Sequence, residues 1–269
     1  MNYRNAWLVF QKDWAEVRQS KQLLIPIIAL PLVIEVILPT MSIQVPALFG
    51  GMSLASQGGG LPLPPQFSSL ASTMTSQQAF VYLMSTVIFA PFMLLVPLLV
   101  SSIISSDSFA GEKERKTIEG LLATPLSDTE LLVGKILGAL IPALAATWIS
   151  GMIYMIVTDA LDYPLFGYLI LPNLFWIIIL FGLAPTFALA AIGLSVIISS
   201  RVNGTREAQQ LTGILVIPII ILMLGEISGV LTLGLAGLIG ILFSVVALDY
   251  IVLRLGLRLF NRERIISKL

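Results

Sequence analysis

Six long apolar segments are the feature that most constrains the fold of this 269-residue chain. A helix needs about 20 predominantly apolar residues to cross the hydrocarbon core of a bilayer. The bilayer core offers no water to the backbone, so segments of this kind cross it as helices. The sequence therefore predicts an all-α integral membrane protein with six transmembrane helices, at roughly 22–41, 79–106, 131–158, 169–199, 209–226 and 230–253.

Composition supports this class and excludes several others. The chain is 57% hydrophobic and only 11% charged, whereas soluble domains carry about 25% charged residues. It contains no Cys and no His, which removes disulfides, thiolate metal sites and the commonest general base. A net charge of zero argues against nucleic acid as a partner. An intramembrane enzyme is also disfavoured, since the acids in the spans form no obvious catalytic pair.

The distribution of positive charge predicts the orientation. With six spans, all fifteen Lys and Arg residues fall on one side of the membrane, and the other side carries only acids. The positive-inside rule then places both termini and the loop 107–130 in the cytoplasm. We therefore expect a multi-pass protein of the plasma (inner) membrane. The cations are Arg4, Lys12, Arg18, Lys21, Lys113, Arg115, Lys116, Lys135, Arg201, Arg206, Arg254, Arg258, Arg262, Arg264 and Lys268.

The chain divides into an N-terminal helix, 1–21, and a six-helix transmembrane domain, 22–269. The N-terminal segment carries an apolar stripe at helical spacing, with charge on the other face. Trp and Tyr favour the headgroup level of a membrane, so we interpret this segment as an amphipathic interfacial helix rather than a signal peptide. Packing on a partner protein is the alternative. The stripe consists of Tyr3, Trp7, Phe10, Trp14 and Val17.

Two outer connections leave room for interpretation. The loop 42–78 carries no charge and is rich in Gly and Pro, which is typical of an irregular connection; a substrate lid is the less favoured reading. The segment 226–240 could contain a re-entrant piece instead of a plain turn. Prolines inside the spans, among them Pro91, Pro97 and Pro185, predict kinks.

The charged loop 107–130 predicts a short amphipathic helix between spans two and three. Glu112 and Lys116 are four residues apart, as are Arg115 and Glu119, so each pair can meet on a helix. Ile118, Leu121 and Leu122 would form the apolar side of this helix. Thr124 and Pro125 would end it, and Ser127 with Glu130 fits a capping box that begins the third span.

This loop also carries a resemblance to a known family. The run Glu112–Leu126, EKERKTIEGLLATPL, is followed by Glu130-Leu131-Leu132 and by Gly134-Lys135. It resembles the cytoplasmic loop of ABC-2 type transporter permeases, the membrane subunits of ATP-binding-cassette exporters. The N-terminal helix, six spans and short basic tail are similar in outline.

The resemblance implies that the loop carries a coupling helix that docks on a separate ABC ATPase subunit. The implied contacts are Glu112, Glu114, Arg115, Thr117, Glu119, Leu121 and Leu122, with a smaller contact from Arg201 and Arg206. The alternative is that the loop is charged and helical only because it is solvated. A second permease copy or a homologue would complete a dimer around the pathway.

The function expected from these features is that of a permease subunit that exports a substrate when the partner ATPase hydrolyses ATP. The sequence contains no G-x-x-x-x-G-K-[ST] run, so we expect no ATPase activity and no cofactor in this chain, with ATP and Mg²⁺ on the partner. A non-transporting component that transmits ATPase-driven motion to an outer partner protein is the alternative.

Two acids lie inside predicted spans. Glu35, in the first span, either contacts a cationic substrate or ion along the pathway or holds helices together; a charge at the bilayer centre costs about 2.5–3.5 kcal/mol on insertion scales. Asp249, in the sixth span, is expected to pair with an arginine.

Overall fold

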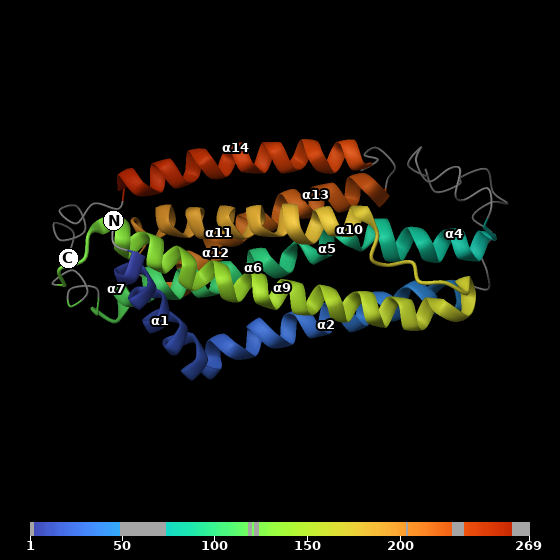
Figure 1. Ribbon diagram of the computed structural model, residues 1–269, viewed down its shortest axis with the longest axis horizontal. Helices are drawn as coiled ribbons and strands as arrows, with labels where there is room; N and C mark the ends of the chain where they lie inside the picture. The colour runs from blue at the N-terminus through green and yellow to red at the C-terminus, as the bar shows by residue number, and fades with distance from the viewer. Residues whose placement is uncertain are drawn as a thin grey trace.

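The computed structural model describes residues 3–48, 74–117, 120, 124–202, 204–227 and 234–259, and every regular element among them is helical. Figure 1 shows long helices lying side by side in one bundle. In chain order the elements are α1 (Tyr3–Gln19), α2 (Lys21–Leu48), α4 (Ser76–Leu83), η1 (Met84–Ile88), α5 (Ala90–Met93), α6 (Leu95–Ser106), η2 (Asp107–Gly111), α7 (Glu112–Glu114), α9 (Asp128–Phe166), α10 (Leu174–Ile178), η3 (Ile179–Leu183), α11 (Ala184–Ser199), α12 (Thr205–Thr212), η4 (Gly213–Leu215), α13 (Val216–Ile227) and α14 (Leu235–Leu259).

The prediction of six membrane spans is confirmed. Six stretches of helix are long and apolar enough to cross a bilayer, which makes the chain a multi-pass membrane protein: Lys21–Ser42, Gln77–Glu114, Asp128–Phe166, Leu174–Ser199, Thr205–Glu226 and Leu235–Gly256. The predicted loop 42–78 falls largely on 49–73, which lies outside the described residues. Of the segment 226–240, for which a re-entrant piece was the alternative, residues 228–233 lie outside them and 235–240 form the start of α14.

Span two is helical throughout but not uniform. Two π-helical turns, η1 and η2, interrupt it, and α5 ends at Met93 close to Pro91. Proline has no N–H to donate to the preceding turn, so the regular ladder of hydrogen bonds is broken where the sequence predicted kinks. Pro185 likewise follows a π-helical turn, η3, whereas Pro142 lies within the continuous helix α9.

Span four begins later than predicted, at Leu174 instead of residue 169. Helix α9 continues to Phe166, and Gly167 ends it with a φ of 73° and an N–H that donates to the Tyr163 carbonyl at 2.8 Å. The Asp159 carboxylate accepts the backbone N–H groups of Ile170 and Leu171 at 2.9 and 3.1 Å. This side chain satisfies backbone groups that a helix would have paired, so apolar residues 169–172 form a connection.

Span two lies at the centre of the bundle, and spans five and six lie at its edge. In the most apolar 18-residue stretch of each span, 72% is buried for span two, 17% for span five and 11% for span six. Trp176 and Tyr154 stack with their ring centroids 4.5 Å apart in the core beside it. The wide apolar faces of α13 and α14 are therefore left to lipid or to another subunit.

Helix α1 is present as predicted, but it packs on its own chain. Its buried face consists of Ala6, Val9, Phe10, Asp13 and Val17, and it lies along the start of α9 (Figure 1). Only the edge of the predicted stripe at Tyr3 and Trp7 is exposed, at 80% and 49%. The helical spacing of the apolar residues indicated one apolar face. It did not indicate that another helix of the same chain covers this face.

Glycines allow this close approach. A Cβ at Gly134 would lie 2.5 Å from the Val9 Cβ and 2.7 Å from the Ala6 carbonyl oxygen, and one at Gly138 would lie 3.1 Å from the Asp13 Cβ. Small residues at a helix contact let two backbones come together inside a membrane. Gly134 and Gly138 therefore allow α1 to pack closely on α9.

We expect Gly134→Ala to destabilise the protein by about 1–3 kcal/mol, because the added methyl group has no room and must push α1 away from α9. The measurement is the unfolding midpoint of the purified protein in detergent. Gly240→Ala is the matched control, since nothing lies within 4 Å of a Cβ at that position of α14. An equal effect of the two changes would contradict the close α1–α9 contact.

Candidate functional site

The helix at the end of span two stops earlier than the sequence predicted. Helix α7 ends at Glu114, Arg115 caps it, and Lys116 has a φ of 56°. A positive φ is unfavourable for a residue with a Cβ, and it breaks the helix. The predicted pairing of Glu112 with Lys116 on one continuous helix is therefore wrong. The predicted helix beyond this break falls mainly on 118–119 and 121–123, which lie outside the described residues.

The predicted start of span three is confirmed in detail. Ser127 caps α9 by accepting the Glu130 N–H at 3.2 Å, and the Glu130 carboxylate accepts the Ser127 N–H at 3.2 Å. The same carboxylate accepts a hydrogen bond from the Asn5 side chain at 3.1 Å. The capping box therefore fixes the beginning of α9 and also ties it to α1.

A buried ion cluster joins α1, the end of span two and α9. It consists of Lys12, Asp13, Ser108, Glu112 and Lys135. One oxygen of the Glu112 carboxylate accepts a hydrogen bond from the Lys12 ammonium group. The other oxygen accepts one from the Lys135 ammonium group, at 2.6 Å. Glu112 and Lys135 are 2% and 1% exposed, so each depends on the other for its charge balance.

Ser108 completes the cluster. Lys135 donates to the Ser108 carbonyl and hydroxyl oxygens at 2.6 and 3.0 Å, and the Ser108 hydroxyl donates to the Asp13 carboxylate at 2.7 Å. The Lys135 ammonium also lies 5.3 Å from the centre of the Phe109 ring. All three ammonium protons of Lys135 thus have acceptors or an aromatic face, as a buried charge requires.

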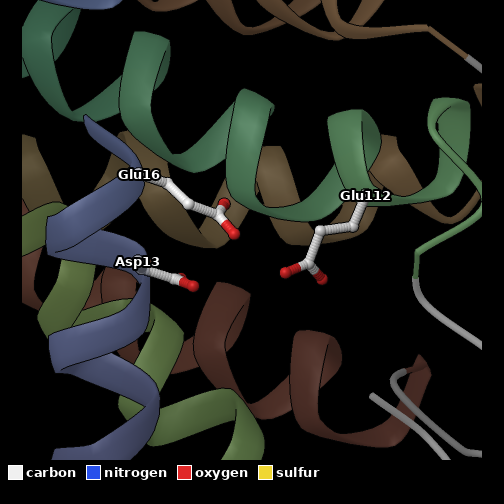
Figure 2. Close-up of side chains that lie close together, drawn as sticks. All are labelled: Asp13, Glu16 and Glu112. Carbon is white, nitrogen blue, oxygen red and sulfur yellow. The ribbon is translucent and has the colours of Figure 1, made fainter. Parts of the chain in front are cut away.

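Figure 2 shows Asp13 and Glu16 reaching from α1 toward Glu112, so that the three carboxylates converge. Their oxygens lie within 4.8 Å of one another, close enough to hold a metal ion. Lys12, however, contacts all three carboxylates, at 3.3 Å for Asp13 and 3.0 Å for Glu16. The lysine ammonium groups supply the positive charge at this point, and we assign the group as an ion-pair network.

Lys12 is positively charged at neutral pH. Burial alone would lower its pKa, but the hydrogen bond and charge of Glu112, with Asp13 and Glu16, outweigh burial and raise the pKa above its usual value. A raised lysine pKa gives stability that is fully present below the unfolded-state value, near 10.4, and is lost only as the pH rises through the folded-state value. The contribution of Lys12 is therefore constant across neutral pH.

Further contacts tie the charged loop to the start of span five and to the turn that precedes it. The exposed Glu114 carboxylate accepts the Thr205 N–H at 2.9 Å and the Thr205 hydroxyl at 2.8 Å, at the beginning of α12. Lys113 donates to the Val202 carbonyl at 3.2 Å. A carboxylate at a helix N-terminus satisfies free N–H groups and favours the helix dipole. Spans two, three and five are thus linked at one end of the bundle.

An open pocket of about 940 Å³ lies beside these links. Arg115 borders it and forms an ion pair with Asp107 at 3.0 Å, and the hydrogen bond to Asp107 raises the pKa of Arg115. Charged residues of both signs therefore face the opening. Its lining comprises Glu16, Gln19, Ser20, Gln22, Leu23, Pro26, Ile103, Asp107, Glu114, Arg115, Thr205, Arg206 and Gln209.

The structure brings three of the predicted contact residues together, because Glu114, Arg115 and Arg206 all line this pocket. Thr117 is exposed next to them, with its hydroxyl donating to the Glu112 carbonyl at 3.3 Å. Arg201 is exposed in the turn after span four. Glu119, Leu121 and Leu122 lie outside the described residues.

Glu112 is placed differently from the prediction. Its side chain is 2% exposed and engaged by Lys12 and Lys135, so it lies inside the fold and not on a surface open to a partner. The prediction gave neither Asp13 nor Lys135 a role in the site. One signal was available: Lys135 is a charged residue inside an apolar segment, and such residues need a partner.

The two acids predicted within spans are both buried. Glu35 is 0% exposed and Asp249 is 5% exposed. Neither has a hydrogen-bond partner within the described part of the chain, so the arginine partner predicted for Asp249 is not found there.

Comparison with known families gives one match. The profile of a family described as "ABC-2 family transporter protein" matches residues 7–240, a stretch that includes most of α1, the charged loop and the first five spans. No curated protein matches the chain in sequence.

We expect Lys135→Met to lower the stability of the purified protein by about 3 kcal/mol, because it leaves a buried carboxylate with one of its two ammonium partners missing. The measurement is the unfolding midpoint in detergent. The double variant Lys135→Met with Glu112→Met removes the buried carboxylate as well, and it should be more stable than Lys135→Met alone. Its remaining ammonium group, on Lys12, is on a side chain that is 37% exposed and can reach water. A double variant as unstable as the sum of both single changes would show that the two residues do not act as a pair.

Proposed function

Because the chain belongs to the ABC-2 family of transporter proteins, we propose that it is the transmembrane permease subunit of an ATP-driven exporter. Family membership implies a role in membrane transport and association with an ABC ATPase subunit. The proposal assigns ATP and Mg²⁺ to that separate subunit and no catalytic activity to this chain. It places the protein in the plasma (inner) membrane, with the ion cluster and the pocket at the cytoplasmic side.

The observation that carries the proposal is the set of polar contacts at one end of the bundle. Glu112 bonds to lysines of α1 and α9, and Glu114 bonds to the start of α12. A force applied to the loop after α7 would therefore reach α1 and spans two, three and five together. This is the mechanical property that a subunit driven by an external ATPase needs.

The pocket beside this link is the part we assign to the ATPase contact. Glu114, Arg115 and Arg206 are exposed there, with Thr117, Glu119, Leu121, Leu122 and Arg201 as further contacts proposed from the family resemblance. Charges of both signs give orientation and partner choice more than raw affinity. We leave Glu112 out of the contact surface because it is buried.

The exposed spans five and six support a dimer. Only 17% and 11% of their most apolar windows are buried within the chain, which leaves broad apolar surfaces for a second permease copy or a homologue. In this arrangement the transport pathway runs between two permeases.

We expect reversal of charge at the pocket, in Glu114→Arg with Arg115→Glu and separately in Arg206→Glu, to weaken ATPase binding by roughly tenfold or more, which corresponds to about 1.4 kcal/mol. The measurement is the amount of ABC ATPase that co-purifies with the tagged permease from membranes. Arg206 is exposed, so its replacement should leave membrane insertion intact.

Arg254→Gln is the matched control, because Arg254 is exposed on α14 and does not line the pocket. It should retain the ATPase. If both charge-reversed variants retained the normal amount of ATPase, the pocket would not be part of the contact surface. Failure of any ABC ATPase to co-purify with the unmodified chain would overturn the proposed function itself.

A further inference from the structure

We propose that an apolar groove between α2 and α9 binds one acyl chain of an anionic phospholipid, whose headgroup lies on Arg18 and Lys21 where α1 meets α2. The groove shares no lining residue with the pocket that we assign to the ATPase contact. The inference therefore holds whether or not that contact is correct.

The groove has a volume of about 290 Å³ and is lined almost entirely by apolar side chains. Figure 1 shows α2 running beside α9 from the bend where α1 ends. These two helices form the walls, and Trp14 and Val17 of α1 complete the lining. Ser150 brings a hydroxyl group, but this donates to the Thr147 carbonyl at 3.0 Å. The groove therefore suits a hydrocarbon ligand.

Small side chains on α9 create the space between the two helices. Ala145 and Ala146 both line the groove, where larger residues would fill the gap. Its edges carry large apolar side chains that are exposed, with Ile28 and Leu32 on α2 and Ile149 on α9. All of these residues belong to spans one and three. The groove therefore opens onto the hydrocarbon of the bilayer.

The length of the groove matches one leaflet of a bilayer. Along α9 its lining runs from Pro142 to Ile153, a length of about 16 Å for an α-helix. Half of a hydrocarbon core is about 15 Å thick. Along α2 the lining ends at Leu32, in the middle of the span Lys21–Ser42. An acyl chain from one leaflet would therefore fill the groove from the headgroup level to the centre of the bilayer.

The other end of the groove lies beside α1. Gly138 of α9, one turn before the lining begins, packs against Asp13 of α1. Trp14 lines this end, and Tyr3 and Trp7 continue the same face of α1 at helical spacing. Trp and Tyr rings favour the headgroup level of a membrane. The groove thus begins where the phosphate groups of the lipids lie.

Two cations lie at this end of the groove. Arg18 follows Trp14 by one turn of α1. Lys21 lies three residues before Leu24 and seven before Ile28 on α2. These intervals place both cations on the groove side of their helices. Both are exposed, and neither forms an ion pair among the described residues.

The charge of these residues selects an anionic lipid. A basic residue close to the membrane surface attracts anionic headgroups, and the arginine guanidinium can bind a phosphate group through two hydrogen bonds. The neighbouring acid Glu16 is engaged by Lys12 at 3.0 Å, and it lines the pocket on the other side of α1. Arg18 and Lys21 can therefore both face one phosphate group, and a zwitterionic headgroup would bring its own positive charge close to them.

The test is the binding of phosphatidylglycerol and of phosphatidylcholine with identical acyl chains to the full chain in a non-ionic detergent, measured by native mass spectrometry. For the first bound lipid we expect a dissociation constant about tenfold lower for phosphatidylglycerol, because two cations face its single negative charge. Arg18→Gln with Lys21→Gln should remove this preference and leave the binding of phosphatidylcholine unchanged. Both side chains are exposed, so the double variant should fold.

A second variant tests the acyl chain. In Ala145→Leu the larger side chain occupies the groove, and both lipids should bind roughly tenfold more weakly because less of the acyl chain is buried. Ala145 is exposed, so the added atoms need not displace the core. Ala247→Leu is the matched control for size and Arg254→Gln the matched control for charge, since both positions are exposed on α14 and neither lines the groove. Both controls should bind the two lipids as the unmodified chain does.

Three results would overturn the inference. The first is equal affinity of the unmodified chain for the two lipids. The second is an equal loss of phosphatidylglycerol binding in Arg254→Gln, which would mean that any surface cation attracts the anionic lipid. The third is unchanged lipid binding in Ala145→Leu, which would exclude the acyl chain from the groove. If this variant instead changed the number of chains in the complex, the groove would be an interface between two copies.

Discussion

The Glu112 carboxylate between the ammonium groups of Lys12 and Lys135 is the interaction on which the charged end of the protein depends. It is the point where α1, the end of span two and the start of α9 meet. None of these charges could be buried alone, because an unpaired ion in such surroundings costs several kcal/mol. The three elements therefore have to move as one body, which makes a loop attached to them an effective place to apply force.

The two ends of the bundle differ in their electrostatic character. At the end that holds α1 and α7, lysines and arginines outnumber or match the acids, and nearly every buried charge has a partner. Toward the other end, Glu35 and Asp162 are buried, and neither forms an ion pair with a Lys or Arg of the described residues. The positive-inside rule predicts such a segregation for a membrane protein.

Much of the architecture could be predicted from the sequence because it depends on short-range patterns. The capping box at Ser127 and Glu130 and the proline interruptions of span two are both local in origin. The predictions that failed involve partners distant in the chain. Span four starts at Leu174 because Asp159 holds the preceding turn, and the charged helix stops at Glu114, where contacts with Thr205 and Val202 replace its continuation.

The sequence by itself determined that this protein has six segments able to cross a membrane, and it carried the resemblance to the ABC-2 family that the comparison bears out. The length of the apolar segments suffices for that, because the thickness of the bilayer sets the length of a spanning helix and its hydrocarbon core offers no hydrogen bonds to the backbone. Only the tertiary structure decided which charges meet. Lys12 is 100 residues from Glu112 in sequence, and no local pattern encodes that distance; the packing of α1 on α9 closes it.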